Sequence, residues 1–214
     1  DQIVALRTDQ VAALKTDQVA AMSTDGIAAM ETRDVAALTT AGVGALTTNQ
    51  VSKGLTTDQI VALRTDQVAA LKTGQIAALT TDQVAAMETG DVAALTSASI
   101  AALSTDQVSK GLTTSQVSAM TTAGVTALST SGVASLTTDQ VVALRTDQIA
   151  ALKTDQIAAL TTDGIAAMET RDIAAMTTAG IAALTTNQVS KGLTTDQVAA
   201  LTTAGAGALT TGGI

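Results

Sequence analysis

The stretch DQVAALKT, from Asp9 to Thr16, contains the pattern that decides the fold. Its two large apolar residues, Val11 and Leu14, are three positions apart and enclose two alanines. Residues three apart lie on one face of a helix but on opposite faces of a strand. Alanine is also depleted in strands. The stretch therefore favours a short helix over a β-strand.

The same octapeptide pattern fills the chain of 214 residues. Aligned on this stretch, the sequence divides into twenty-six units and a three-residue remnant; three units have nine residues and the others eight. The third position is Val or Ile except at Ala206, and the last apolar position is always Leu or Met. Self-similarity at a fixed period is typical of solenoids. We therefore predict a single repeat array over 1–214, with no linker or second domain.

A longer repeat of seven units is superimposed on the octapeptide. Its complete copies are blocks 1–57, 58–114 and 139–195, and its partial copies are 115–138 and 196–214. The first and third complete blocks are identical at 48 of 57 positions. This pattern indicates growth by duplication of a seven-unit block.

Each complete block ends with a nine-residue unit in which Ser-Lys-Gly replaces the usual Ala-Ala. The lysines and glycines of these insertions are Lys53, Gly54, Lys110, Gly111, Lys191 and Gly192. Because glycine accepts backbone angles that other residues avoid, we expect a bulged or broken helical turn. We interpret the insertions as structural corrections of the coil phase, or as bends. The alternative is a spaced set of lysine side chains that docks a partner.

One continuous helix does not fit the octapeptide, because eight residues overshoot two turns by roughly 80°. We predict one short helix per unit, with Thr8 as an N-cap and Asp9 in the first turn, where the helix dipole favours a negative charge. Val11 and Leu14 would form the buried face. A helix of about six residues is unstable alone, so only a stacked array can fold. The predicted fold class is therefore an all-α solenoid of very short capped helices, forming an elongated rod or superhelix.

The number of units per coil stays open at this stage. Two units would form antiparallel helix pairs, and three would form a triangular coil. The second position is usually Gln, a candidate for hydrogen bonds between coils, and seven units have Gly there, which predicts softer coils. Arg7, Lys15 and their counterparts in other blocks stand just before the capping threonines, and we expect them to pair with Asp of an adjacent coil.

The composition excludes several classes of function. The chain has no His, Cys, Pro, Trp, Tyr or Phe and a net charge of −8. An acidic chain without aromatic residues is unsuited to nucleic acid, which requires a basic face and usually stacking groups. The sequence contains no run of 18 apolar residues, so we predict no membrane insertion. We predict no enzymatic activity, no cofactor and no dedicated metal site, since general acid–base chemistry needs His or paired carboxylates in a cleft.

The phrase LTTDQVAALTT, from Leu193 to Thr203, resembles the octapeptide tracts of very large bacterial secreted or surface proteins of adhesin- or haemagglutinin-like type. Some of these are labelled RTX-like, but the glycine-rich nonapeptide of calcium-binding β-rolls does not occur here. The resemblance implies an extracellular or cell-surface spacer, coat or filament-forming rod that associates with itself. The first alternative is an adhesin module that binds a ligand or polysaccharide. A second, ranked below it, is an ice-binding or calcium-stiffened repeat with weak calcium contacts.

Overall fold

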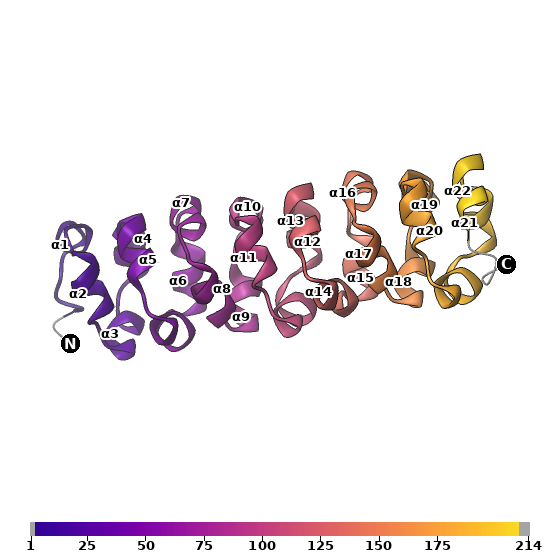
Figure 1. Cartoon of the computed structure of the whole chain (residues 1–214). Coiled ribbons are helices and arrows are strands. Elements are labelled where there is room, and N and C mark those ends of the chain that lie inside the picture. The colour runs from indigo at the N-terminus through magenta and orange to yellow at the C-terminus, as the bar shows by residue number, and fades with distance from the viewer. Residues whose placement is uncertain (1–2, 210–214) are drawn as a thin grey trace. The chain divides into compact units, whose positions relative to one another are not determined.

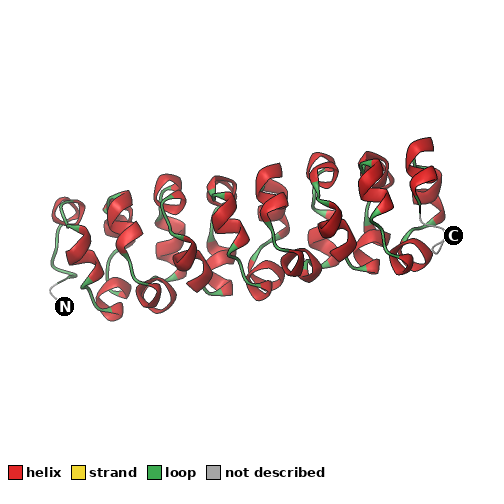
Figure 2. Cartoon of the chain, in the orientation of Figure 1, coloured by secondary structure: helices red, strands yellow, loops and turns green. Residues whose placement is uncertain are grey.

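The structure is a computed structural model that describes residues 3–209. Contacts divide the chain into two compact units, Asp1–Leu112 and Thr113–Ile214. Within residues 3–209 all regular secondary structure is helical, with no strand, and short loops join the helices (Figure 2). From the second octapeptide onward each octapeptide forms one short helix, and helices of a unit stack on one another (Figure 1). The predicted all-α solenoid of very short helices is therefore confirmed, and the single array over 1–214 stays a prediction.

The helices of the first unit have five or six residues each and begin at the threonine or serine that closes the preceding octapeptide, apart from two π-helical turns. They are α1 (Thr8–Ala12), α2 (Thr16–Ala20), α3 (Thr24–Ala28), α4 (Thr32–Ala37), α5 (Thr40–Ala45), η1 (Gln50–Gly54), α6 (Thr57–Ala62), α7 (Thr65–Ala69), α8 (Thr73–Ala78), α9 (Thr81–Ala86), α10 (Thr89–Ala94), α11 (Ser97–Ala101) and η2 (Gln107–Gly111).

The second unit repeats the same design with one π-helical turn. Its helices are α12 (Thr114–Ala119), α13 (Thr122–Ala127), α14 (Thr130–Ser135), α15 (Thr138–Val142), α16 (Thr146–Ala151), α17 (Thr154–Ala159), α18 (Thr162–Ala167), α19 (Thr170–Ala175), α20 (Thr178–Ala182), η3 (Gln188–Gly192), α21 (Thr195–Ala199) and α22 (Thr203–Ala208).

Each helix packs against the helix three octapeptides further along the chain. In the first unit this produces three rows, α1–α4–α6–α9–η2, α2–α5–α7–α10 and α3–η1–α8–α11. In the second unit the rows are α12–α15–α18–η3, α13–α16–α19–α21 and α14–α17–α20–α22. Three octapeptides therefore form one coil, and of the two coil geometries left open by the sequence the triangular one is found.

The core of each unit consists of the third and sixth positions of the octapeptides. Val35 and Leu38 illustrate the pair: both are buried, and corresponding Val or Ile and Leu or Met residues are buried in most other coils. The two alanines between them lie toward the outer side of the coil and are half-buried or exposed in most units. Each coil therefore contributes only a thin apolar layer, as expected from a chain without aromatic residues.

The helix caps lie one residue earlier than the sequence analysis places them. Thr8 is the first residue of α1, and the N-cap residue is Arg7. Where the cap residue is Thr or Ser, its hydroxyl accepts a hydrogen bond from a first-turn N–H, as Thr39 does from Gly42 at 3.0 Å. The expectation of Thr8 as an N-cap is therefore wrong, because the helix already includes that threonine. The position of Asp9 in the first turn is confirmed.

Candidate functional site: the glutamine links and the bulged turns

The glutamine at the second position of an octapeptide joins one coil to the coil before it. Gln75 is buried, and its Oε1 accepts a hydrogen bond from the backbone N–H of Lys72, the N-cap residue of its own helix, at 2.7 Å. Its Nε2 donates to the backbone oxygen of Val43 at 2.9 Å and to that of Leu46 at 2.8 Å. A single side chain thus caps one helix and binds two carbonyl groups four octapeptides earlier. We call this arrangement a glutamine link.

Glutamine links recur along both units with the same geometry. They are made by Gln50, Gln59, Gln67, Gln75, Gln83, Gln107, Gln148, Gln156, Gln188 and Gln197. The sequence-based hypothesis that glutamines bond between coils is confirmed. Gln10 and Gln18, in the earliest described coil, have exposed side chains whose Oε1 accepts from their own N-cap residues, Arg7 and Lys15.

Three aspartates occupy the glutamine position, once in each complete block. Because a carboxylate only accepts hydrogen bonds, it cannot donate to carbonyl groups as the glutamine amide does. Each of these buried aspartates instead accepts a hydrogen bond from a threonine hydroxyl of the preceding coil. The pairs are Thr8 with Asp34 at 2.6 Å, Thr65 with Asp91 at 2.8 Å, and Thr146 with Asp172 at 2.6 Å. The sequence analysis missed this exchange, although the segment METRD, which occurs at 30–34 and again at 168–172, ends at this position in two of the three blocks.

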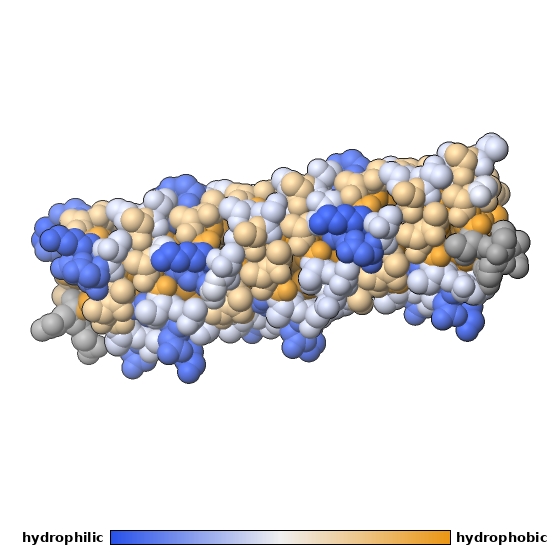
Figure 3. All heavy atoms as spheres, in the orientation of Figure 1, coloured by the Kyte–Doolittle hydropathy of each residue, from blue (hydrophilic) through white to orange (hydrophobic). Residues whose placement is uncertain are grey.

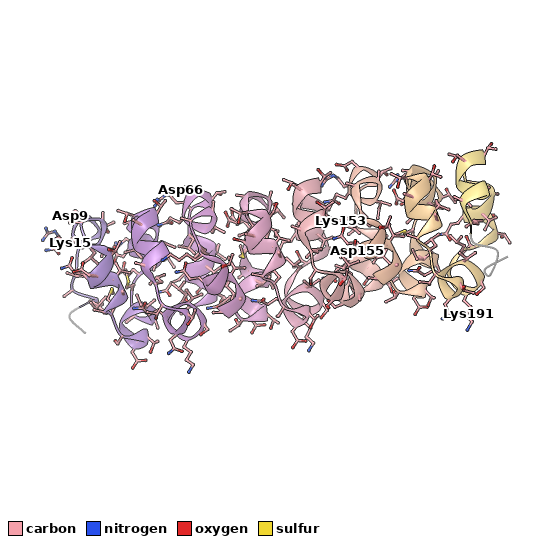
Figure 4. All side chains as sticks on the ribbon, in the orientation of Figure 1. Asp9, Lys15, Asp66, Lys153, Asp155 and Lys191 are labelled. Atoms are coloured by element: carbon pink, nitrogen blue, oxygen red, sulfur yellow. The ribbon has the colours of Figure 1, made fainter. Side chains whose placement is uncertain are left out.

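The arginines pair with aspartates nearby in sequence, which makes the expected pairing with an adjacent coil wrong. The Arg64 Nε lies 3.0 Å from Asp66 Oδ1, and Arg7 and Arg145 bind Asp9 and Asp147 in the same way. These pairs lie on exposed corners, and Figure 4 labels Asp9 and Asp66 at the outer ends of their helices. The cause is geometric. The arginine is the N-cap residue and the aspartate lies in the first turn of the same helix, so both side chains lie at the corner of the coil where that helix begins.

These ion pairs make a small, pH-dependent contribution to stability. The side-chain hydrogen bond from Arg64, together with the charge of Arg64, lowers the pKa of Asp66 below its usual range. A carboxyl group whose folded-state pKa is lowered stabilises the fold above its unfolded-state pKa, and this stabilisation is lost as the pH falls through the folded-state value. Because the pair is about half exposed, solvent screening keeps its contribution small.

The insertions form π-helical turns, so the predicted bulge is confirmed. In η1, η2 and η3 the extra residue widens the turn. The backbone N–H of the leucine that follows donates to the backbone oxygen of the glutamine five residues earlier, as Leu55 does to Gln50 at 2.8 Å. No glycine among residues 3–209 has a positive φ. The expected reason, unusual backbone angles at the glycine, is therefore wrong.

Close packing explains the glycine instead. A Cβ atom on Gly54 would lie 3.1 Å from Ile27 Cβ and 3.2 Å from the backbone oxygen of Thr24. Gly111 and Gly192 approach Val84 and Ile165 equally closely. The widened turn therefore lies directly on the helix three octapeptides earlier. The role of the insertions in correcting the coil phase stays a prediction.

The lysines of the insertions do not form one row in the first unit. Lys53 belongs to η1, in the row of α3 and α8, whereas Lys110 belongs to η2, in the row of α6 and α9. The physical reason is that seven octapeptides per block are not a multiple of the three octapeptides per coil. Both lysines are exposed, Lys110 is paired with Asp106 at 2.8 Å, and Lys191 in the second unit extends outward in Figure 4.

We predict that Gly54→Ala lowers the free energy of unfolding by about 1–3 kcal/mol, because the new methyl group overpacks the contact with Ile27. Gly74→Ala is the matched control, since a Cβ there meets nothing within 4 Å and the loss of glycine should stabilise slightly. Urea unfolding followed by circular dichroism measures both. Equal stabilities of the two variants would contradict close packing as the reason for Gly54.

A surface groove lies over α5 in the first unit. It is an open depression with a volume of about 540 Å³, and it is lined by Thr16, Thr40, Ala41, Gly44, Ala45, Ala70 and Lys72. Gly44 occupies a position that is usually alanine, and a Cβ there would lie 3.4 Å from the backbone oxygen of Ala70. Gly44 thus removes one methyl group from the wall of the groove.

Two kinds of site are not found in the described part of the chain. Residues 3–209 contain no group of three or more carboxylate, His or Cys side chains that could hold a metal ion. Within the same residues no helix has the length and apolar character required to cross a membrane.

The stacked three-helix coils place the chain in the class of α-helical solenoid repeat proteins. The family model of the ALTTAQ repeat matches residues 1–24, 27–65, 53–81, 60–87, 84–122, 112–146, 141–162 and 165–203. These matches cover most of the sequence, and the chain belongs to the ALTTAQ repeat family. A comparison with curated proteins finds no significant match.

Proposed function

We propose that the chain is a non-enzymatic structural region of a bacterial secreted or surface protein, located outside the cell, where it acts as a spacer, coat or filament-forming rod. The observation that carries this proposal is the glutamine link. Each link uses a buried side chain to join consecutive coils, and the same bonds recur at Gln50, Gln59, Gln67, Gln75 and Gln83 in succession.

A uniform bonding pattern suits a mechanical role. Because the same octapeptide supplies the core pair, the cap and the link, a further block adds coils without needing new contacts. Most side chains that the units share pack in the core or form hydrogen bonds within and between coils. The exposed corners carry mainly Thr, Asp, Arg and Lys. Such a design favours a protein whose length is adjusted by duplication.

Small-angle scattering of the chain and of a variant with a second copy of 1–57 inserted after residue 57 tests the spacer role. We expect a rod-like profile whose maximum dimension grows by about 20 Å, since seven octapeptides add a little over two coils at about 9 Å each. A radius of gyration that grows only as the cube root of the mass, as in a compact globule, would contradict the proposal.

Self-association is part of this proposal and rests on the outer alanines. Alanine-rich outer surfaces appear as pale orange areas between blue clusters in Figure 3, and Val61 and Val142 add larger exposed apolar side chains, 47% and 44% exposed. Light scattering should show mass increasing with protein concentration, and Val61→Ser/Val142→Ser should weaken the increase. A monomer at all concentrations would limit the role to that of a spacer.

The groove over α5 favours a second candidate function, binding of a ligand or polysaccharide. Thr16, Thr40 and Lys72 line it, and hydroxyl and amine groups can hydrogen-bond sugar hydroxyls. A polysaccharide array probed with the chain and with Gly44→Val, which adds a bulkier side chain to the groove wall, tests this role. Binding that is equal for both proteins, or no binding, would rule the groove out as the site.

A further inference from the structure

The first described coil carries two glutamines whose amide groups do not form a link. In Gln10 and Gln18 the Oε1 accepts a hydrogen bond from the N-cap residue, as in the linking glutamines. Their Nε2 groups donate to no protein atom of residues 3–209, and both side chains are exposed. The Nε2 of Gln75, by contrast, donates to two carbonyl groups of an earlier coil. We call the outer side of α1 and α2 that carries Gln10 and Gln18 the glutamine face.

The last helices carry the complementary features. Val198 of α21 is 45% exposed, although the third-position residues from Val11 to Ile181 are at most 2% exposed. In other coils the sixth-position backbone oxygens accept from linking glutamines. No side-chain donor of the described residues reaches the corresponding oxygens of Leu193 and Leu201. We call the surface formed by Val198 and these two oxygens the valine face.

The two faces match as the two sides of the interface between consecutive coils. Each helix packs on the helix three octapeptides earlier, and each linking glutamine binds carbonyl groups four octapeptides earlier. When α1 of one copy packs on α21 of another, Gln18 takes the place of a linking glutamine over the Val198 and Leu201 oxygens. The added coil also covers the Val198 side chain, and burial of apolar surface is favourable.

The second glutamine fits a nine-residue unit. In the same arrangement Gln10 lies over η3, where the Val189 and Leu193 oxygens are the acceptors. The first unit already contains a link of this kind, because Gln83 donates to two backbone oxygens of the nine-residue unit around η1, at 2.8 and 2.6 Å. The Oε1 atoms of Gln10 and Gln18 are held by their caps, so little side-chain entropy is lost when the amides bind.

We propose that the chain binds a second copy of itself end to end, with the glutamine face of one copy on the valine face of the next. Gln10 and Gln18 each donate two hydrogen bonds across this contact, and Val198 becomes buried in it. Because the two faces differ, every added copy leaves one face of each kind open, and association continues beyond a dimer. End-to-end binding extends the self-association of the proposed function and rests on it, but the contact lies at the end coils and not at the outer alanines.

Sedimentation velocity of the chain and of Gln10→Glu/Gln18→Glu tests the contact. A glutamate still accepts the hydrogen bond from the N-cap N–H, but as a carboxylate it cannot donate to a carbonyl group. We expect the mass of the unsubstituted chain to grow with concentration. The variant should associate about 30-fold more weakly or less still, since both pairs of hydrogen bonds are lost.

Gly74→Glu/Gly90→Glu is the matched control for the added charge. Both glycines are exposed, and a Cβ atom at either position meets nothing within 4 Å. The control adds the same two negative charges away from the glutamine face. It should therefore associate as the unsubstituted chain does, and an equal loss of association in the control would contradict the role of the two glutamines.

A mixing experiment separates an end-to-end contact from a lateral one. Val198→Lys places a charge on the valine face at an exposed position, so this variant should also be monomeric alone. An equimolar mixture of Val198→Lys and Gln10→Glu/Gln18→Glu contains one intact face of each kind. It should form a dimer of the two variants and no larger species. A circular dichroism melt checks the fold of each variant, and Val198→Ser takes the place of the lysine variant if that one is unfolded.

Equal association of Gln10→Glu/Gln18→Glu and the unsubstituted chain would overturn end-to-end binding. A mixture that stays monomeric while the unsubstituted chain associates would do the same. If Val61→Ser/Val142→Ser abolishes association and the glutamate variant keeps it, the contact is lateral; end-to-end binding then fails and the self-association of the proposed function stands. A chain that is monomeric at every concentration contradicts both, and the spacer role remains.

Discussion

Gln75→Ala is expected to lower the free energy of unfolding of the first unit by about 2–4 kcal/mol. The substitution removes three hydrogen bonds made by one buried side chain, to the backbone groups of Lys72, Val43 and Leu46. A buried polar group left without its partner costs about 1–3 kcal/mol. The Val43 oxygen retains one hydrogen bond, because it also accepts from the Leu46 N–H. The full cost therefore falls on the Lys72 N–H and the Leu46 oxygen.

Gln18→Ala is the matched control for this experiment. Gln18 also follows a lysine cap residue in nearly the same octapeptide, and its Oε1 accepts from the Lys15 N–H at 2.8 Å. Its side chain is exposed, so the substitution should cost only the cap, about 0.5–1 kcal/mol. Urea unfolding measured by circular dichroism gives both values. If the two variants lose equal stability, the link between coils contributes nothing beyond capping.

Amide hydrogen exchange locates the effect within the unit. Because a solenoid unfolds in neighbouring segments rather than always as a whole, loss of one link should raise exchange mainly in α5 and α8 and their row neighbours. Exchange that rises evenly across the whole first unit would indicate a cooperative unfolding step and not a local link.

The octapeptide predicted the helices because its signals are local. Val11, the alanine after it and the acidic first turn all act within one helix, and each is found in α1; Leu14 lies just past the end of that helix and is half-buried. The cap was misplaced by one residue for a related reason. Two consecutive residues in most octapeptides carry a hydroxyl, and the spacing alone does not decide which of them precedes the first helical residue.

The number of units per coil could not be predicted, because it depends on contacts between residues about 24 positions apart. The partners of the glutamines were likewise hidden, since Gln75 binds carbonyls 29 and 32 residues earlier. No single octapeptide records such a distance. The buried aspartates were missed because an Asp near a helix start is usually explained by the helix dipole. That explanation accounts for the exposed Asp9, but it does not account for the burial of Asp91 or for its hydrogen bond from Thr65.

In the second unit, the three octapeptides over 163–186 form a coil without any glutamine link. Their second positions are Gly164, Asp172 and Gly180, and the one side-chain bond that this position makes to the preceding coil is that from Thr146 to Asp172. The glycines leave the carbonyl groups of the earlier coil without the amide donors that other coils supply. The interface should therefore open more readily than those held by Gln148 or Gln188, as the glycine pattern of the sequence predicts.

The double variant Gly164→Gln/Gly180→Gln is expected to raise the free energy of opening this coil by about 4 kcal/mol. Each glutamine adds about three hydrogen bonds with a net value of roughly 0.5–1.5 kcal/mol each. Each also removes a glycine from a helix, which stabilises by a further 0.5–1 kcal/mol or so. The total is lower than the sum because ordering two long side chains costs entropy.

The local geometry can accept both substitutions. A Cβ atom on Gly180 would lie 3.3 Å from Thr177 Oγ1, and one on Gly164 would lie 3.0 Å from Thr161 Oγ1. The N–H of each glycine donates to that threonine at 3.0 Å, whereas Gln59 makes the same bond to its cap threonine at 3.2 Å. A shift of a few tenths of an ångström in the threonine makes room at Gly180, and at Gly164 the Val141 side chain, 3.3 Å from the new Cβ, has to shift by a similar amount.

Hydrogen exchange over residues 155–186 measures the change, and Gly74→Gln is the control. Gly74 is exposed and stands at the first position of its octapeptide, so a glutamine there removes a glycine without forming a link. We expect slower exchange of this coil, by a factor of about 10²–10³, in the double variant and little change in the control, since 1.4 kcal/mol corresponds to tenfold. If exchange in the double variant stays as fast as in the unsubstituted chain, the glutamine link is not what holds one coil to the next, and the mechanical role proposed for the array loses its structural basis.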